Sequence, residues 1–158
     1  MEKQNEKFMG EAIKLSLKGV LSGKGGPFGA IVVKNNQIIA EDHNRVTSTN
    51  DPTAHAEVVA IRKACKKLKT FNLVGCELYT SCEPCPMCLG AIYWSHLDAV
   101  YFANTKKDAA SIGFDDLFIY QEINRPIDKR RTKFKQIMHA EALTAFDLWR
   151  SKIDKTRY

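Results

Sequence analysis

The stretch Thr-Ala-His-Ala-Glu at residues 53–57 and the stretch Pro-Cys-Pro-Met-Cys at residues 84–88 decide how this chain folds. Each stretch carries the signals of a helix N-terminus. Asp51 is a good N-cap and Pro52 a good first helical residue, so we expect residues 53–57 in the opening turns of a helix. Pro84 suits the first position of a second helix for the same reason. The sequence therefore predicts two helix starts that carry polar side chains.

These side chains form a set of metal ligands. Cys85 and Cys88 lie one helical turn apart, so both sulfur atoms face one side. The unpaired N–H groups and the dipole of a helix start favour the thiolate form. With the imidazole of His55 they supply three ligands to a tetrahedral Zn²⁺ and leave the fourth position to water. This pattern is typical of a catalytic zinc site, where the bound water ionises near pH 7 to a hydroxide nucleophile.

Glu57 follows the histidine by two residues. A carboxylate beside the metal can take a proton from the water and deliver it to a leaving amine, so we expect Glu57 to be the catalytic acid–base. A lone Cys-x-x-Cys is also common in redox pairs and in structural zinc sites. A structural zinc would need a fourth Cys or His at ligand spacing, so the pattern favours the catalytic site.

Length and composition predict one domain over residues 1–158. The chain has 158 residues, 44% of them hydrophobic, which is enough for one packed core. No apolar run approaches the length of a membrane span, and the N-terminus lacks the apolar segment of a signal peptide, so we expect a cytoplasmic protein. Cys65, Cys76 and Cys82 fit buried free thiols of a reducing compartment.

The net charge of +6 raises the possibility of an RNA partner. The basic residues are spread along the chain, with groups at residues 63–69, 106–107 and 129–131. No aromatic residues alternate with them as on a surface that stacks bases. The charge is therefore interpreted as a solvated surface, and nucleic acid is not expected as a partner.

Hydrophobic periodicity predicts both helices and strands. The expected helices are residues 8–21, a helix from the first stretch to about Leu68, residues 106–112 and residues 142–153. The expected strands are residues 30–33, 37–40, 76–81 and 99–103, with a possible edge strand at 133–138. Asn35 and Asn36 predict a two-residue hairpin between the first two strands. The order strand, helix, strand around residues 84–88 predicts a parallel pair with ligands bound at the carboxyl ends of its strands.

Four motifs resemble those of the bacterial guanine deaminases, within the cytidine deaminase-like superfamily of zinc deaminases. They are Gly-Gly-Pro-Phe-Gly-Ala at 25–30, Asn-Asp-Pro-Thr-Ala-His-Ala-Glu at 50–57, Thr-Ser-Cys-Glu-Pro-Cys-Pro-Met-Cys at 80–88 and Gly-Phe-Asp-Asp at 113–116. The spacing His-x-Glu followed by Pro-Cys-x-x-Cys is the known signature of zinc deaminases. The resemblance implies an α/β fold, a three-layer α/β/α sandwich with a five-stranded mixed sheet, and a homodimer whose C-terminal helix and tail are exchanged.

The resemblance also implies the function and the substrate contacts. It implies hydrolytic deamination of guanine to xanthine and ammonia. The residues expected to hold the base are Asn44, Asp116, Phe28, Trp94, Ala56 and Tyr158. Considered without the resemblance, Phe28, Trp94 and Phe114 are more often core residues than substrate contacts.

Other functions stay open at the level of sequence. A tRNA adenosine deaminase shares both zinc stretches but needs a site open to a polynucleotide. Guanosine, cytidine or ammeline are alternative small substrates. An RNA-binding module with a structural zinc is a further class, which would bind RNA in a salt-dependent way and release no ammonia.

Overall fold

The computed structural model describes residues 2–157, which divide into two units, residues 1–116 and residues 117–158. The first unit holds the sheet and both residues 53–57 and residues 84–88. Among residues 2–157, no helix is both long enough and apolar enough to cross a membrane.

The first unit is built on a mixed sheet of four strands. They are β1 (Gly29–Lys34), β2 (Gln37–His43), β3 (Cys76–Cys82) and β4 (Ala99–Asn104), in the order β2-β1-β3-β4. β1 pairs antiparallel with β2 and with β3, and β3 pairs parallel with β4. Asn35 and Asn36 have φ angles of 50° and 58°, which confirms the predicted two-residue hairpin.

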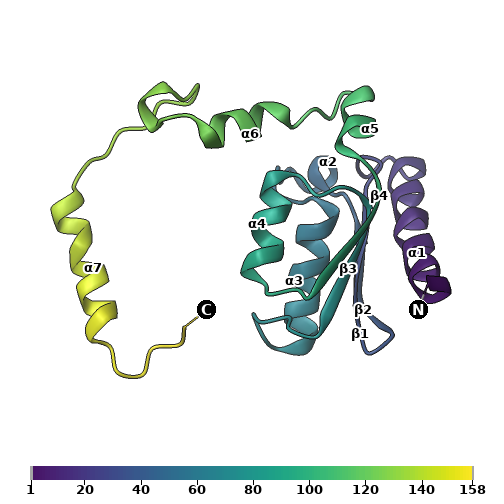
Figure 1. The fold of residues 1–158 in the computed structure, drawn as a ribbon, viewed down its shortest axis with the longest axis horizontal. Coiled ribbons are helices and arrows are strands. Elements are labelled where there is room, and N and C mark those ends of the chain that lie inside the picture. Colours follow the sequence, from purple (N-terminus) through teal and green to yellow (C-terminus); the bar gives the residue numbers. More distant parts are fainter. Residues whose placement is uncertain (1, 158) are drawn as a thin grey trace. The chain divides into compact units, whose positions relative to one another are not determined.

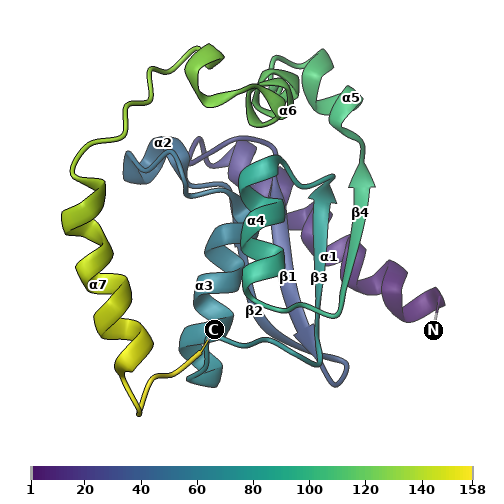
Figure 2. The same cartoon turned by 60° about the vertical axis from the view of Figure 1, so that its left-hand side comes forward.

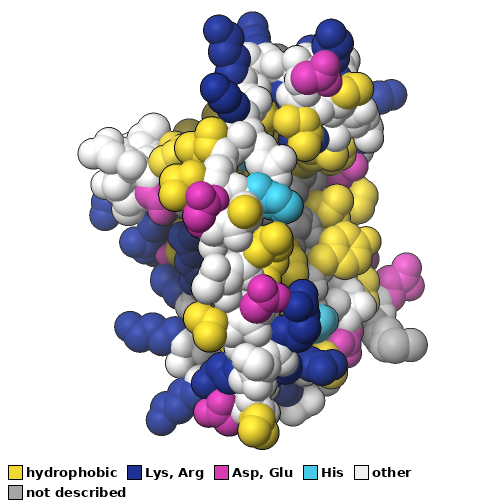
Figure 3. All heavy atoms as spheres, turned by 90° about the vertical axis from the view of Figure 1, so that its left-hand side faces the viewer, with side chains coloured by type: hydrophobic (Ala, Val, Ile, Leu, Met, Phe, Trp, Pro, Cys, Tyr) yellow, Lys and Arg dark blue, Asp and Glu magenta, His cyan; other side chains and the backbone are white. Residues whose placement is uncertain are grey.

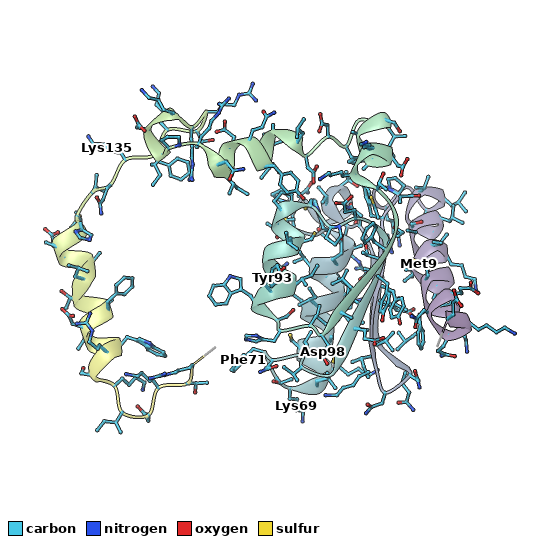
Figure 4. All side chains as sticks on the ribbon, in the orientation of Figure 1. Met9, Lys69, Phe71, Tyr93, Asp98 and Lys135 are labelled. Atoms are coloured by element: carbon cyan, nitrogen blue, oxygen red, sulfur yellow. The ribbon has the colours of Figure 1, made fainter. Side chains whose placement is uncertain are left out.

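Helices cover both faces of this sheet (Figures 1 and 2). Helix α1 (Glu2–Leu21) lies on one face, while α3 (Ala56–Leu68) and α4 (Pro86–Trp94) lie on the other. Figure 4 labels Met9 on α1 and Tyr93 on α4, on opposite sides of the strands. The short helices α2 (Val46–Thr49) and α5 (Lys106–Ser111) complete the unit. The predicted α/β/α layering is therefore confirmed for residues 1–116.

The central strand β1 joins the two helical layers, because its side chains contribute to the hydrophobic cores on both faces of the sheet. All but the last of its residues are buried, because alternate side chains enter different cores. Ile31 and Val33 pack with Phe8, Ala12 and Tyr79 beneath α1. On the other face the core is larger and lies beneath α3 and α4; its buried members are Ala30, Val32, Ala40, Ala56, Ala60, Ile61, Ala64, Leu73, Cys76, Leu78 and Ile92.

Helix α3 begins four residues later than the sequence predicts. Its first residue is Ala56, and His55 is the N-cap residue. Asp51 is not an N-cap: its carboxylate accepts hydrogen bonds from the backbone N–H and hydroxyl of Thr53, at 2.8 and 2.6 Å. Pro52 fits this turn as well as a helix start, because both accept its fixed φ. The prediction of the helix was right and that of its cap was wrong.

Helix α4 shows the same kind of shift. Pro86, not Pro84, is its first residue, and Cys85 is the N-cap residue. Cys88 is then the third helical residue, and its backbone position is fixed by the first turn. Both prolines precede apolar helical residues, so local sequence alone does not choose between them.

The second unit contains α6 (Leu117–Asn124), the 3₁₀ turn Ile127–Lys129 and α7 (His139–Ser151). None of the residues of these three elements is buried. Figure 3 looks onto the side of the chain that carries α7 and shows hydrophobic side chains, in yellow, at the surface among charged ones. The C-terminal helix predicted at residues 142–153 is confirmed as α7, while α6 was not predicted.

Two predictions about strands were wrong: the possible edge strand at residues 133–138 and the five-stranded sheet that the resemblance implies. Residues 133–138 have no regular secondary structure, and the part of the chain that the structure describes contains four strands. A strand exists only as part of a hydrogen-bonded ladder. No other strand lies within residues 117–157 to supply a partner, so local β propensity is not sufficient there.

Candidate active site

The two helix starts bring three ligand atoms together at the carboxyl end of β3. The imidazole of His55, at the start of α3, lies beside the thiols of Cys85 and Cys88, at the start of α4. The ligand atoms of these three residues all lie within 4.8 Å of one another, and they form the one such metal-ligand group found among residues 2–157. The grouping predicted from the sequence is therefore present.

The distances within the group match a tetrahedral zinc site. Nδ1 of His55 lies 3.5 Å from each sulfur atom, and the sulfur atoms of Cys85 and Cys88 lie 3.6 Å apart. Zinc–sulfur bonds of about 2.3 Å and zinc–nitrogen bonds of about 2.0 Å at tetrahedral angles require a nitrogen–sulfur distance of roughly 3.5 Å and a sulfur–sulfur distance of roughly 3.8 Å. One imidazole and two thiols are also a preferred donor set of Zn²⁺. The residues present therefore fit a zinc ion.

The electrostatics of the two thiols favour a cation between them. The side-chain hydrogen bonds that Cys85 shares with Cys88 and with His55 lower its pKa to about 4, so this sulfur is a thiolate at neutral pH. The same contact with Cys85, followed by burial, raises the pKa of Cys88. Two adjacent thiolates repel, and a divalent cation compensates both charges.

Glu57 is the buried carboxylic acid of this site. It is the second residue of α3 and is 6% exposed. Burial is the main cause that raises its pKa, and the negative charge of Cys85 adds to the effect. A carboxyl group whose pKa is raised toward neutrality can both accept and donate a proton during a reaction. The environment of Glu57 therefore suits general acid–base chemistry.

Asn44 lies in a tightly packed loop after β2 and is 6% exposed. Its Oδ1 accepts the backbone N–H of Val46 at 3.1 Å and that of Gly26 at 3.4 Å, and its own N–H donates to the carbonyl of Phe28 at 2.8 Å. Its Nδ2 has no hydrogen-bond partner among residues 2–157. The amide nitrogen is thus the atom of Asn44 that can bind a ligand.

Phe28 is half-buried and meets the ring of Phe114 edge to face, with ring centroids 4.9 Å apart. Neither residue follows from periodicity, because each stands in a glycine-containing loop. The signal in the sequence is the run of glycines before Phe28. At Gly25 an added Cβ would lie 1.8 Å from the carbonyl oxygen of Asn44, so only glycine allows this approach of the two loops.

Of the other four residues predicted to bind the base, the three that the structure describes differ in how far they are buried. Asp116 is partly buried, and its pKa is raised by burial and by the charge of Cys85. Ala56 is fully buried at the first position of α3. Trp94 is 68% exposed at the last position of α4, roughly 12 Å along the helix axis from Pro86. Tyr158 lies outside the described residues. The roles of all four in substrate binding stay predictions.

Comparison with known proteins connects this site to a family. The model of the cytidine and deoxycytidylate deaminase zinc-binding region matches residues 2–104. The chain is 54% identical to a guanine deaminase of Bacillus subtilis over 154 residues, which are 98% of this chain and 99% of that protein. It is 39% identical to a tRNA-specific adenosine deaminase of Aquifex aeolicus over 116 residues, 73% of this chain and 74% of that one.

The same relationship holds between structures. The X-ray structure of the guanine deaminase from Bacillus subtilis superimposes with a TM-score of 0.94 at 55% identity, covering 97% of this chain and 98% of that chain. The matched region includes the histidine, the two cysteines and the carboxylic acid described above. The chain therefore belongs to the cytidine and deoxycytidylate deaminase zinc-binding family.

Proposed function

We propose that this protein deaminates guanine hydrolytically to xanthine and ammonia, as a step of purine salvage or catabolism in the cytoplasm. The observation that carries the proposal is the group of His55, Cys85 and Cys88 with the buried Glu57 at its side. It stands in a chain whose likeness to a guanine deaminase continues past residue 104, where the match to the wider family ends.

His55, Cys85 and Cys88 would hold the zinc ion, and their mutual distances of 3.5 and 3.6 Å support this assignment. A zinc ion bound there supplies a water that ionises near neutral pH. The N-cap positions of His55 and Cys85 keep these two ligands rigid, because each is fixed by the backbone of the helix that follows.

Glu57 carries the protons of the reaction. It takes one from the attacking water and delivers it to the amino group of the base, so that a carbon–oxygen bond replaces the carbon–nitrogen bond and ammonia leaves. Because the carboxyl group is buried, its pKa is raised, which brings it closer to the value that serves both transfers at neutral pH.

Recognition of the base is assigned to groups around this centre. Guanine offers N7 and O6 as acceptors, and Asn44 has a free Nδ2 that can donate to one of them. Its ring N–H and amino groups are donors, which the carboxylate of Asp116 can accept as a pair. Phe28 covers the face of the base, supported by the edge of Phe114. Ala56 offers the backbone N–H of the first helical residue.

The C-terminal unit is assigned to the partner subunit of a homodimer. No residue of α6 or α7 is buried, and Leu148 and Phe146 on α7 are 68% and 69% exposed. Exchange of a terminal element between two copies is a low-cost way to cover such side chains. In this proposal Trp94 and the partner's tail, including Tyr158 of the partner subunit, close the site around the base and exclude water.

The alternative enzyme is a tRNA adenosine deaminase, which the 39% identity to such a protein of Aquifex aeolicus favours. It would act on an adenine flipped out of an anticodon loop. The two functions differ in the size of the substrate, and a direct assay separates them.

We expect ammonia release from free guanine, and none from a tRNA anticodon loop, in a screen over free bases, nucleosides and RNA. The variant Glu57→Gln should lower guanine turnover by at least about 10²-fold, because an amide cannot transfer protons between the water and the amino group. Zinc content should stay at one ion per chain in both proteins. Guanine turnover by Glu57→Gln at the wild-type rate would contradict the role of Glu57, and turnover of the RNA alone would favour the alternative enzyme.

The zinc content of the protein should depend on Cys88 and not on the nearby Cys82. Cys88→Ser removes one of the three ligands, so we expect it to lose most of the metal and the activity. Cys82→Ser is the matched control: this thiol is also buried, but it contacts the carbonyl oxygen of Thr105 at 3.7 Å instead of the ligand group. Metal analysis by atomic emission measures both variants. Full zinc in Cys88→Ser would remove this residue from the ligand set.

Substrate binding should depend on Asp116. In Asp116→Asn one acceptor becomes a donor that faces a donor of guanine, a mismatch that costs about 1–3 kcal/mol. We expect guanine turnover to fall roughly tenfold or more with unchanged zinc content. Asp115→Asn is the control for the assignment, since the two acids are neighbours. A loss confined to Asp115→Asn would show that the neighbouring carboxylate binds the base.

The tail should act in trans. Removal of residues 156–158 is expected to lower guanine turnover while zinc content and helix content stay unchanged. The Glu57→Gln chain keeps its tail but lacks the catalytic acid, whereas the truncated chain keeps Glu57 but lacks the tail. A heterodimer of the two chains should therefore recover one working site. The measurement is turnover per verified heterodimer. Heterodimers without activity, formed from parents that are each inactive, would rule out a tail supplied by the partner.

A further inference from the structure

Asp42 is a buried carboxylate outside the zinc site. It stands on β2, two residues before Asn44, and is 4% exposed. Its Oδ1 accepts the backbone N–H of His43 at 2.8 Å and the Nε–H of Arg45 at 2.9 Å. The ammonium group of Lys63 lies 2.6 Å from Oδ2 and forms an ion pair with it. A charge buried in this way persists only because it is paired.

The two cations approach this carboxylate from the surface. The side chains of Arg45 and Lys63 are 42% and 47% exposed, whereas that of Asp42 is 3% exposed. Burial opposes ionisation of Asp42, but its contacts with Lys63 and Arg45 outweigh burial and lower its pKa, so it is charged at neutral pH. One buried negative charge therefore fixes two flexible side chains that would otherwise move freely in water.

Each cation belongs to a segment of the active site. Lys63 lies on α3, six residues after Glu57 on the same helix. The backbone N–H of Arg45 donates to the carbonyl of Ala54 at 2.9 Å, immediately before His55. Asp42 thus connects the end of β2 to α3 and, through Arg45, to the segment that leads into the zinc ligand.

Asn44 stands inside this connection, between Asp42 and Arg45. From the opposite side Gly25 packs against its carbonyl, where even a Cβ would lie only 1.8 Å from the oxygen. The backbone N–H of Asn44 is bonded to the carbonyl of Phe28. The backbone of Asn44 is therefore held between the Gly25 loop on one side and the pairing of Asp42 with Arg45 on the other, while its Oδ1 accepts the N–H groups of Val46 and Gly26.

We propose that Asp42 is a positioning residue for the base: by holding Arg45 and Lys63 it fixes the distance between Asn44 and the start of α3. This inference rests on the proposed function, in which Asn44 binds guanine. Asp42 itself touches neither the ligand group nor the base in this proposal. The core contacts of Ala56 and Ala60 hold α3 independently, so the loss of Asp42 should displace Asn44 and leave Glu57 in place.

The test is Asp42→Asn, which keeps the shape of the side chain and removes its charge. A displaced Asn44 weakens binding equally in ground and transition states, so KM for guanine should rise roughly tenfold while kcat stays within about threefold of wild type. Zinc should remain at one ion per chain. Amide hydrogen exchange at Asn44, Arg45 and Val46 should become faster, with the amides of α3 unchanged. Arg45→Gln, a change at an exposed side chain that should not prevent folding, should shift KM in the same direction.

Glu41→Gln is the matched control, because it removes one negative charge from an exposed neighbouring position of the same strand. KM and exchange rates in Asp42→Asn that equal those of Glu41→Gln would overturn the proposal. A parallel loss of zinc and kcat would also overturn it, since it would indicate a general structural role. If the wild-type protein does not act on guanine, the proposed function fails. Hydrogen exchange then tests the positioning role separately. Exchange rates at Asn44, Arg45 and Val46 that are the same in Asp42→Asn as in wild type would reject that role.

Discussion

The close approach of three atoms, Nδ1 of His55 and the sulfurs of Cys85 and Cys88, is the constraint on which the first unit depends. Their distances require the starts of α3 and α4 to meet at one end of the sheet. β3 makes this possible, because it pairs with β1 on one side and β4 on the other and ends three residues before Cys85. A cation at this point would offset two thiolates beside the buried carboxyl group of Glu57, so metal binding and folding of this end of the sheet are expected to be coupled.

Much of this arrangement could be predicted from the sequence, wherever a signal is local and strong. The hairpin at Asn35 and Asn36 needs positive φ at two successive residues, a demand that few residue types meet. The ligand set could be predicted from residue chemistry, because a histidine, a Cys-x-x-Cys and a glutamate near the histidine together indicate a catalytic zinc site and few other kinds of site. The buried thiols of Cys76 and Cys82 follow from their apolar neighbours.

The parts that could not be predicted depend on partners distant in the chain. Pro52 and Pro84 suit both a turn and a helix start, and only the folded neighbourhood decides that the helices begin at Ala56 and Pro86. The pairing of Asp42 with Lys63 joins residues 21 positions apart on different elements, and no periodicity indicates it. Residues 133–138 have strand-like composition, but pairing is a property of two segments and the second is absent from residues 117–157.

The distribution of charge separates the zinc site from the basic character of the chain. Residues 117–158 contain ten of the 24 Lys and Arg residues and five of the 18 Asp and Glu residues, which leaves 14 and 13 for residues 1–116. The unit with the metal ligands is thus nearly neutral. A polynucleotide is attracted by a concentration of positive charge around the site that processes it. A neutral purine needs none, because paired hydrogen-bond donors and acceptors are enough to hold it. The near-neutral first unit therefore lacks, by itself, the concentration of positive charge that a polynucleotide requires.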